Sequence, residues 1–308
     1  MRGASPAARD VLICPPGPPG LLKIQRYWAE DGSTGQPLTL GPLMVSSRAH
    51  YALPRRPAPR PRPDTMLPGG HVWAGMIYGH FGHFITETLP RLLSIRTTLD
   101  ANPAARIAGF AAYGTTRTDL GPMAWFLDRA GIDPARIDVI TAPTRLTSLI
   151  IPPAPFPRRF AYAPEVAGLI DRHGLSAPQS SGERIFLSRG QLATSRSRVT
   201  NIPEIEALFA ESGYTILHPE TLDLAQQIAR ITSAEVLAGE NGSALHWSLY
   251  SRSIRRVQSL GWSLALQRAI CALRDQQYQV LRAPWTGWAQ GRSQHVPARV
   301  VRHALQLP

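Results

Sequence analysis

The sequence predicts an α/β fold that is divided into two halves. Two observations carry this prediction: strands alternate with helices of about ten residues along most of the chain, and a proline-rich stretch interrupts the alternation. The length of 308 residues fits one large α/β domain or two ordinary ones. We therefore predict an N-terminal segment at residues 1–70, a first α/β lobe at residues 71–160, and a Rossmann-like second lobe with a C-terminal tail at residues 161–308.

The composition narrows the class of protein. The net charge of +12 comes almost wholly from arginine, and Lys23 is the single lysine. These charges are spread along the chain and form no basic block of the kind that binds nucleic acid. Cys14 and Cys271 lie far apart, so a CxxC zinc or redox motif is absent. The first twenty residues lack an apolar signal core, and no apolar run reaches the roughly 18 residues of a membrane-spanning helix.

The segment ALPRRPAPRPRPDTMLPGG (residues 52–70) is dense in proline and arginine, which predicts an extended arm. A basic arm of this kind could bind acidic lipid headgroups, although a solvated loop is the simpler interpretation. We expect a cytoplasmic protein that has room for peripheral contact with the inner face of the membrane. The oligomeric state is not predicted.

The first half continues with a helix in GHFGHFITETLPRLL (residues 79–93) and a strand in RIAGFAAYG (residues 106–114). The segment DLGPMAWFLDRAGI (residues 119–132) predicts a helix, with Asp119 as its N-cap. Two further strands are predicted in RIDVI (residues 136–140) and RLTSLIIPPAP (residues 145–155). The proline-rich segment PPAPFPRRF (residues 152–160) predicts a crossover between the halves.

The second half alternates more regularly, which predicts a parallel, doubly wound sheet with right-handed connections. Its predicted strands are ERIFLSR (183–189), YTILH (214–218), EVLAG (235–239), RRVQSLG (255–261) and YQVLR (278–282). Its predicted helices are IPEIEALFAESG (202–213, closed by Gly213), TLDLAQQIARITSA (221–234), GSALHWSLYS (242–251) and SLALQRAICALRD (263–275).

The first candidate site is a polar stripe on the helix at residues 79–93. At about 100° per residue, four side chains fall within roughly 80° of one another on a helical wheel: His80, His83, Glu87 and Arg91. Apolar side chains gather on the other flank, which predicts an amphipathic helix. Pro90 is expected to kink or end the helix near Leu89.

Three interpretations of the stripe remain open. It can be a solvated surface helix on which Glu87 pairs with Arg91. His80, His83 and Glu87 can be metal ligands, although the spacing differs from HExxH and no second cluster supplies further ligands. Alternatively, Glu87 can orient His83, which then accepts a proton from a substrate hydroxyl.

The second candidate site is the segment EVLAGENGSALHWSLYS (residues 235–251). Gly239 and Gly242 flank a turn after a strand, and the amides of Gly242, Ser243 and Ala244 open a helix that suits a diphosphate. Glu240 could accept hydrogen bonds from ribose hydroxyls. The segment contains neither GxGxxG nor a P-loop, so the NAD and NTPase fingerprints are absent. We include Asn241 and His246 among the candidate donor-binding residues.

The third candidate site follows the strand at residues 183–189. Ser188 and Arg189 end this strand, and Arg196 and Arg198 lie on the loop that follows it. Arginines that converge on a strand-end loop predict a phosphate clamp. Taken singly, each can also be an ordinary surface arginine.

Together these three regions resemble glycosyltransferase family 61, over about His71 to Leu260. The family's GHF/W-x-x-E-x-L-x-R-L helix corresponds here to Gly82, His83, Phe84, Glu87, Leu89, Arg91 and Leu92. The family's strand that ends in Ser-Arg corresponds to Ser188–Arg189, and the Arg and Asn-x-x-Glu that follow it correspond to Arg198 and to Asn201 and Glu204. The family's glycine turn corresponds to Gly239, Gly242 and Leu245. The chain departs from many members at Asn241 and Trp247, where they have His and Asn.

The resemblance implies a GT-B-like fold, with two Rossmann-like lobes that face each other across a cleft. It implies an inverting transferase with no DxD-bound metal and no cofactor, and the sequence has no DxD. The substrates would be a nucleotide sugar and a glycan or other hydroxyl acceptor, with a role in surface polysaccharide synthesis, such as capsule. His83 and Glu87 would be catalytic, beside His80 and Arg91 on the acceptor side.

On the donor side, the resemblance and the strand-end pattern assign these residues to phosphate and nucleotide binding: Ser188, Arg189, Arg198, Gly239, Glu240, Asn241, Gly242, Ser243 and His246. Two other classes of protein stay open at this stage. The first is a non-enzymatic, basic nucleic-acid-binding protein, which the net charge would suit. The second is a metal-dependent hydrolase that uses His80, His83 and Glu87.

Overall fold

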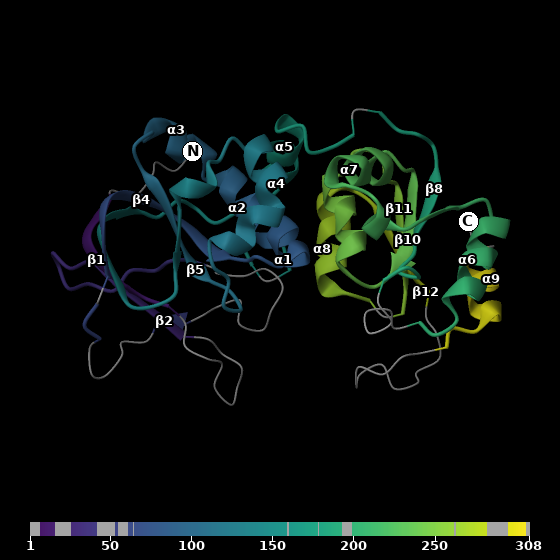
Figure 1. Cartoon of the computed structure of the whole chain (residues 1–308), viewed down its shortest axis with the longest axis horizontal. Helices are drawn as coiled ribbons and strands as arrows, with labels where there is room; N and C mark the ends of the chain where they lie inside the picture. The colour runs from purple at the N-terminus through teal and green to yellow at the C-terminus, as the bar shows by residue number, and fades with distance from the viewer. Residues whose placement is uncertain are drawn as a thin grey trace. The chain divides into compact units, whose positions relative to one another are not determined.

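A computed structural model describes residues 7–15, 26–41, 53–54, 61–63, 65–158, 160–177, 179–192, 199–261, 263–281 and 295–305. The chain forms two compact units, Met1–Leu169 and Ile170–Pro308, and each contains its own sheet (Figure 1). Helices and largely parallel strands make up both units, so the predicted α/β class is confirmed. No described helix combines the length and the apolar character that crossing a bilayer requires.

In the described part of the first unit, a seven-stranded sheet has the order β3-β2-β1-β7-β4-β5-β6. Strands β4, β5, β6 and β7 pair in parallel, whereas β1 pairs antiparallel with β7 and β2. The strands are β1 (Ala8–Cys14), β2 (Arg26–Glu30), β3 (Leu53–Pro54), β4 (Thr65–Ile77), β5 (Arg106–Ala111), β6 (Ile137–Ile140) and β7 (Thr144–Ile150). The three strands predicted in this half correspond to β5, β6 and β7. Residues 65–70 of the predicted arm begin β4.

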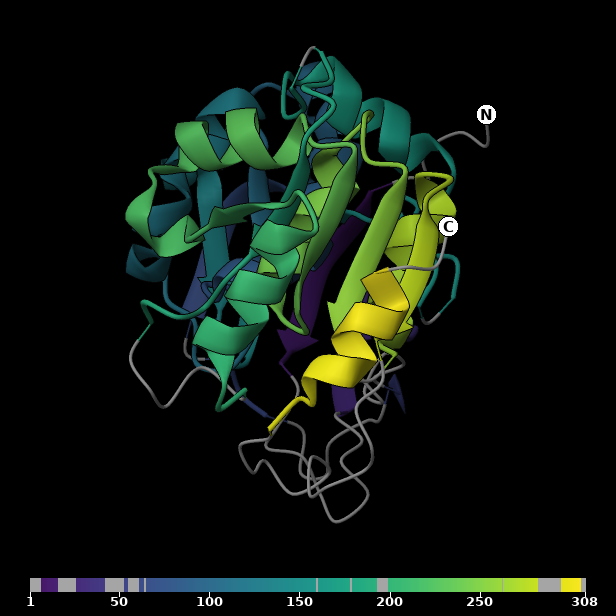
Figure 2. The same cartoon turned by 90° about the vertical axis from the view of Figure 1, so that its right-hand side faces the viewer.

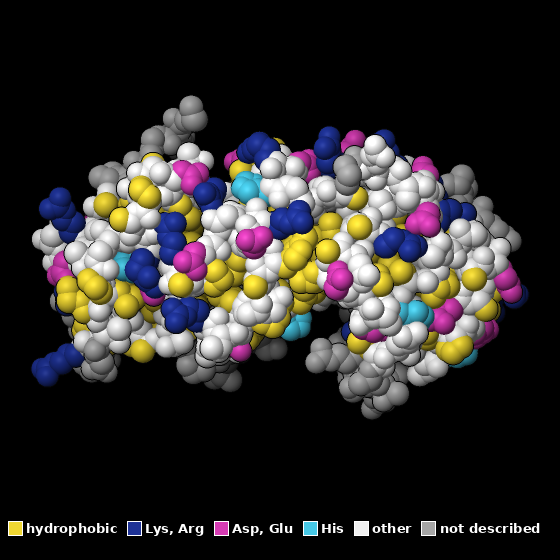
Figure 3. Space-filling view, turned by 45° about the horizontal axis from the view of Figure 1, so that its top comes forward, with side chains coloured by type: hydrophobic (Ala, Val, Ile, Leu, Met, Phe, Trp, Pro, Cys, Tyr) yellow, Lys and Arg dark blue, Asp and Glu magenta, His cyan; other side chains and the backbone are white. Residues whose placement is uncertain are grey.

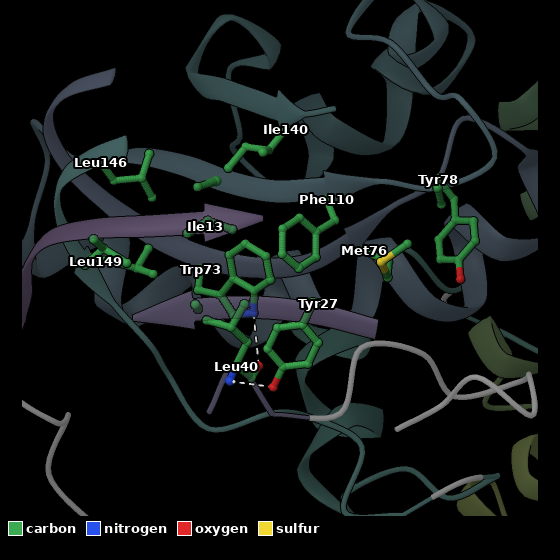
Figure 4. Packing of buried hydrophobic residues seen from close by; sticks show 14 residues of the cluster. Ile13, Tyr27, Leu40, Trp73, Met76, Tyr78, Phe110, Ile140, Leu146 and Leu149 are labelled. Atoms are coloured by element: carbon green, nitrogen blue, oxygen red, sulfur yellow. Dashed lines mark hydrogen bonds between the residues drawn. The ribbon is translucent and has the colours of Figure 1, made fainter. Parts of the chain in front are cut away.

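The core of the first unit fixes β4 in place (Figure 4). Trp73 packs edge-on against Phe110 of β5, with ring centroids 4.8 Å apart. The Trp73 indole N–H donates to the carbonyl of Leu40 at 3.0 Å, and the Leu40 N–H donates to the Tyr27 hydroxyl at 3.1 Å. Both polar ends of these buried aromatic rings are therefore hydrogen-bonded. Tyr78, which follows β4 directly, leads from this core into the segment that carries the predicted polar stripe.

The helical segments of the first unit are shorter and less regular than predicted. They are α1 (Phe81–His83), a π-helix η1 (Phe84–Thr88), α2 (Leu89–Ser94), α3 (Arg96–Ala101), a 3₁₀-helix η2 (Thr118–Met123), α4 (Ala124–Arg129) and η3 (Pro134–Arg136). The prediction of Asp119 as an N-cap is wrong, because Asp119 lies inside η2. Its Oδ2 accepts hydrogen bonds from the backbone N–H and the hydroxyl of Thr116, at 2.6 and 2.9 Å, and so closes the preceding turn.

The second unit is a parallel sheet covered on both faces (Figure 2). Its described strands have the order β12-β11-β10-β8-β9, with β8 (Arg184–Leu187), β9 (Thr215–Leu217), β10 (Val236–Glu240), β11 (Arg256–Leu260) and β12 (Gln277–Leu281). Helices α6 (Ile202–Glu211) and α9 (Ala298–Leu305) cover one face, and α7 (Leu224–Thr232) and α8 (Ala265–Leu273) cover the other (Figure 1). Helix α5 (Glu165–Arg172) and the 3₁₀-helix η4 (Pro219–Thr221) complete the described helices before β10. The predicted alternation of this half is confirmed.

The segment predicted as a helix at residues 242–251 is a 3₁₀-helix, η5 (Ser243–Tyr250). It leaves β10 through Gly242, and its first turn closes with the Leu245 N–H donating to the Gly242 carbonyl at 3.2 Å.

The strand order of the second unit contains one reversal of direction. The chain runs from β8 outward to β9, and then returns to place β10 on the other side of β8. In open α/β sheets, ligands bind at the carboxyl ends of the strands beside such a reversal. The residues that follow β8 and β10 therefore flank the expected ligand position of this sheet.

Candidate functional site

The helical segment after β4 is held by side-chain hydrogen bonds and by an irregular backbone. The Tyr78 N–H donates to the Thr88 hydroxyl at 3.0 Å, which ties the end of β4 to the helix. Pro90 has no N–H to donate, and the Thr86 carbonyl instead accepts the Tyr162 hydroxyl at 2.9 Å. The Leu89 N–H donates to Phe84, five residues back, as in a π-helix. The helix therefore continues to Ser94 and does not end at Leu89, where it changes from a π-helix to an α-helix.

His80 and His83 of the polar stripe reach solvent, whereas Glu87 and Arg91 are buried, so the interpretation of the stripe as a solvated surface helix does not hold. Glu87 and Arg91 are only 2% and 3% exposed. Gly75 of β4 makes room for the arginine: a Cβ atom built on Gly75 would lie 2.5 Å from Arg91 Nε. The guanidinium also lies over the ring of Phe156, 5.2 Å from its centroid. A helical wheel gives the relative directions of side chains but not which direction faces solvent.

His83 and Glu87 form a hydrogen-bonded pair in which only the histidine reaches solvent. His83 Nδ1 lies 2.8 Å from Glu87 Oε1, and the two side chains are 30% and 1% exposed. The buried carboxylate accepts from Nδ1–H, so Nε2 is the ring nitrogen that can exchange a proton with a ligand. This is the geometry of a general base oriented by a carboxylate.

Arg91 supplies a buried positive charge beside this pair. Burial lowers the pKa of Arg91 to about 10, and the nearby Glu87 and Tyr78 oppose that shift. The guanidinium therefore stays charged at neutral pH, and it attracts the Glu87 carboxylate. Because a buried charge is costly unless it is compensated, the nearby Glu87 helps to keep the Arg91 guanidinium charged.

Two tyrosines complete the surroundings of His83, and sequence reasoning missed both. The ring of Tyr78 stacks on the imidazole, with centroids 4.8 Å apart and an interplanar angle of 19°. The ring of Tyr113 lies 5.8 Å from the same imidazole and is 73% exposed. Burial, and then the charge of Glu87, raise the pKa of Tyr78 well above its usual value, so this phenol stays neutral. Tyr113 ends a predicted strand, and nothing in its local pattern distinguishes it.

A pocket of about 750 Å³ opens beside the pair. Its walls are formed by residues that follow β4 and β5: Gly79, His80, His83, Tyr113, Gly114, Thr115, Thr118, Asp119 and Pro122. The structure thus brings His80 and His83 to one pocket, while Glu87 and Arg91 are not among the lining residues. Within the described ranges, no three His, Cys, Asp or Glu side chains converge as metal ligands. The alternative ligand set of His80, His83 and Glu87 is therefore not assembled.

The contact between Gly75 and Arg91 gives a prediction about stability. Gly75→Ala is expected to lower the free energy of unfolding by about 2–4 kcal/mol, because the added methyl group meets Arg91 and the residue has a φ of 74°. Gly69→Ala is the matched control, because Gly69 is on the same strand with a φ of 86° and nothing within 4 Å. Urea unfolding measures both variants. Equal losses in the two would show that the packing of Arg91 on β4 adds nothing.

In the second unit, the residues that follow β8 and β10 lie next to each other. A Cβ atom built on Gly242 would lie 3.1 Å from Arg189 Nη1, so the guanidinium lies against the turn that opens η5. A Cβ atom on Gly239 would lie 2.9 Å from the Leu187 carbonyl, which explains why glycine is needed where β10 packs beside β8. The structure therefore brings Arg189 to the predicted phosphate-binding turn.

The other predicted donor-side residues occupy different environments. Glu240, Asn241 and His246 are buried, and Ser243 is half-buried. His246 Nδ1 lies 3.0 Å from Gln267 Oε1 of α8, in a network between η5 and α8. Ser188 donates its hydroxyl to Glu206 and accepts from the Gly190 N–H at 2.9 Å. Arg198 and Arg196 lie outside the described residues.

Sequence reasoning also missed a polar group next to Ser188. His218 follows β9, and its Nε2 lies 3.9 Å from Glu206 Oε1 of α6. These side chains are close because the carboxyl ends of β8 and β9 share one edge of the sheet. A histidine that ends a predicted strand was the available signal for this position, but the partner on α6 required the fold.

Two comparisons with known proteins bear on the family of the chain. A search of curated proteins gave no match. The sequence model of the family described as Glycosyltransferase 61 matches residues 81–257, which is more than half of the chain. The match includes the His83–Glu87 pair in the first unit and the contact of Arg189 with Gly242 in the second. The chain belongs to glycosyltransferase family 61.

Proposed function

We propose that this protein is an inverting, metal-independent glycosyltransferase that moves a sugar from a nucleotide-sugar donor to a hydroxyl of a glycan acceptor. The observation that carries this proposal is the His83–Glu87 pair, with its imidazole at the pocket and its carboxylate buried. Membership of the family supports the transfer of a glycosyl group. The donor, the acceptor and the stereochemistry are part of the proposal.

The first unit activates the acceptor. The acceptor hydroxyl approaches Nε2 of His83 from the pocket and donates its proton to it as the oxygen attacks. Glu87 stabilises the imidazolium that forms, through its 2.8 Å contact with Nδ1. Because Glu87 is only 1% exposed, it acts through His83 and does not contact the acceptor. Of the two residues, His83 is therefore the base.

The second unit binds the donor at the carboxyl ends of β8 and β10. The side chain of Arg189 and the backbone amides that open η5 would surround the diphosphate. This position coincides with the reversal of strand order, where ligands bind in open α/β sheets. The positive charge of Arg189 replaces the metal ion that a DxD motif would hold.

The reaction then balances as a single displacement. The acceptor oxygen forms a bond to the anomeric carbon while the bond from that carbon to the diphosphate oxygen breaks. The proton goes to His83, and the negative charge goes to the diphosphate beside Arg189. Attack opposite the leaving group inverts the configuration at the anomeric carbon. A GT-B-like arrangement of the two units, which would bring both substrates together, stays a prediction.

The biological role that we propose is the synthesis of a surface polysaccharide, because a family glycosyltransferase with a glycan acceptor suits that purpose. The alternative of a nucleic-acid-binding protein lacks a concentrated basic surface on the face shown in Figure 3. Lys and Arg side chains are scattered there among acidic and neutral ones. Salt-dependent binding to random DNA, without nucleotide-sugar binding, would favour that alternative.

Transfer is expected to survive chelation. Incubation with EDTA should leave the turnover within about twofold of the untreated enzyme, since arginine supplies the charge at the diphosphate. A thermal-shift screen against nucleotide sugars identifies the donor for this assay. Complete loss of activity with EDTA, restored by manganese, would contradict the metal-independent mechanism and leave the transferase assignment standing.

A further inference from the structure

Tyr113 is an exposed aromatic side chain at the wall of the pocket. Over the described residues, Tyr113 and Met66 are the large apolar side chains that remain exposed, at 73% and 61%. Single exposed apolar residues usually need no explanation. Tyr113 differs because it lines the same pocket as His83, with its ring centroid 5.8 Å from the imidazole.

The backbone holds Tyr113 in an uncommon conformation. Its φ is 50°, in the left-handed region that an aromatic residue seldom adopts, and Gly114 follows with a φ of 73°. The loop is fixed on both sides: the Thr115 N–H donates to the Ala112 carbonyl at 2.9 Å, and the Gly79 N–H donates to the Thr115 hydroxyl at 3.0 Å. Strained residues that the surrounding structure holds in this way cluster at ligand sites.

Polar groups stand around the ring. His80, Thr118 and Asp119 are exposed and line the pocket with Tyr113. Hydrogen bonds from Thr116 lower the pKa of Asp119, so its carboxylate is ionised at neutral pH. A carboxylate has about four acceptor positions, and Asp119 can therefore accept hydroxyl donors from a ligand in addition to its bonds with Thr116. The pocket thus offers one apolar surface and a rim of hydrogen-bonding groups.

We propose that Tyr113 is the platform on which the acceptor binds as a pyranose ring. The apolar C–H face of the sugar would pack on the tyrosine ring, its hydroxyls would bond with Asp119 and Thr118, and one hydroxyl would reach His83. A sugar has an apolar face and a polar edge together, and this pocket has a complement to both. The inference rests on the proposed function in that His83 is the group that the bound hydroxyl meets.

The test is direct binding of methyl pyranosides to the whole protein. Saturation-transfer NMR at about 10 mM of the methyl glycosides of glucose, galactose, mannose, xylose and N-acetylglucosamine reports weak binding and the ring face in contact. Tyr113→Asn removes the ring and keeps a residue that tolerates a positive φ. Tyr113→Phe keeps the ring and removes the hydroxyl. Melting temperatures confirm that both variants fold.

We expect at least one pyranoside to bind wild-type protein through one face of its ring. The affinity should be about tenfold weaker in Tyr113→Asn, and the affinity of Tyr113→Phe should differ from wild type by under about threefold. Binding of none of them, or equal binding by Tyr113→Asn and wild type, would overturn the inference. Nucleoside diphosphate titration of the same samples separates the two proposals. If the protein binds nucleotides but no pyranoside, the acceptor platform is contradicted and the transferase proposal stands. If it binds a pyranoside in a way that depends on the Tyr113 ring but binds no nucleotide, the platform is supported and the transferase proposal is contradicted.

Discussion

Replacement of His83 by alanine is expected to lower the turnover of sugar transfer by about 10²–10⁴-fold, the usual contribution of a general base. The variant should fold, because the side chain is only partly buried at the pocket wall. Its affinity for nucleoside diphosphates should stay within about twofold of wild type, because the proposed donor site is in the second unit. Initial rates with the donor found by thermal shift, together with a nucleotide titration, measure both quantities.

His303→Ala is a suitable control, because this histidine is exposed on α9, outside the proposed site. It should leave the turnover unchanged. Near-native turnover in folded His83→Ala would show that His83 is structural. Loss of the fold in His83→Ala would indicate instead that the imidazole stabilises the packing of the helix on β4.

Glu87→Gln refines the same prediction, because it keeps the size of the side chain and removes its charge. The turnover should fall less than in His83→Ala. The acidic limb of the profile of rate against pH should move to lower pH, because the protonated imidazole loses its carboxylate partner. A purely structural role of Glu87 would change stability and leave the pH profile in place.

Arg189→Ala is expected to weaken the binding of nucleoside diphosphates by about tenfold or more. A charge-assisted hydrogen bond contributes roughly 1.5–3 kcal/mol, and each 1.4 kcal/mol is a factor of ten in affinity. Gly242→Leu should have a similar effect, since its side chain would enter the space beside Arg189 where the phosphates bind. Gly242 has a φ of 166°, an extended conformation that any residue adopts, so this variant does not strain the backbone.

Arg302→Ala is the matched control for Arg189→Ala, because Arg302 is an exposed arginine on α9. Isothermal titration should give wild-type affinity for the control. If Arg189→Ala and Gly242→Leu also bind nucleoside diphosphates like wild type, the turn after β10 is not the phosphate site. In that case the polar residues Ser188, Glu206 and His218 become the next candidates.

The alternation of strands and helices from β8 to β12 could be predicted from the sequence, whereas α5 and α9 were not predicted. The strands of the second unit are short apolar runs, its helices are about ten residues long, and its connections are brief, so local patterns determine the order of elements. The adjacency of Arg189 and Gly242 follows, because parallel strands place their carboxyl ends on one edge. The type of the helix after Gly242 could not be predicted, since α- and 3₁₀-turns share the same local residue preferences.

The first unit was harder to predict for a physical reason. Arg91 packs against Gly75 and Phe156, and the Tyr162 hydroxyl donates to the Thr86 carbonyl. These three residues lie outside the helix and meet it only after folding. Pro90 predicted a kink or an end of the helix, but the hydroxyl of Tyr162 satisfies the carbonyl that the proline leaves, and the helix continues to Ser94. Tyr113 joined the site through a loop conformation that no sequence pattern marks. The placement of His83, Glu87 and Arg91 on one helical segment was therefore predictable, and the burial of Glu87 and Arg91 was not.

The central claim is that a nucleotide diphosphate binds to the second unit beside Arg189. Isothermal titration of wild-type protein with a panel of nucleoside diphosphates of all common bases tests it most directly. We predict that at least one of them binds with a dissociation constant in the micromolar range, about −8 kcal/mol at 1 μM, and that Arg189→Ala weakens it. Wild-type protein that binds none of the panel at millimolar concentration would contradict the transferase proposal, whatever the His83 variants show.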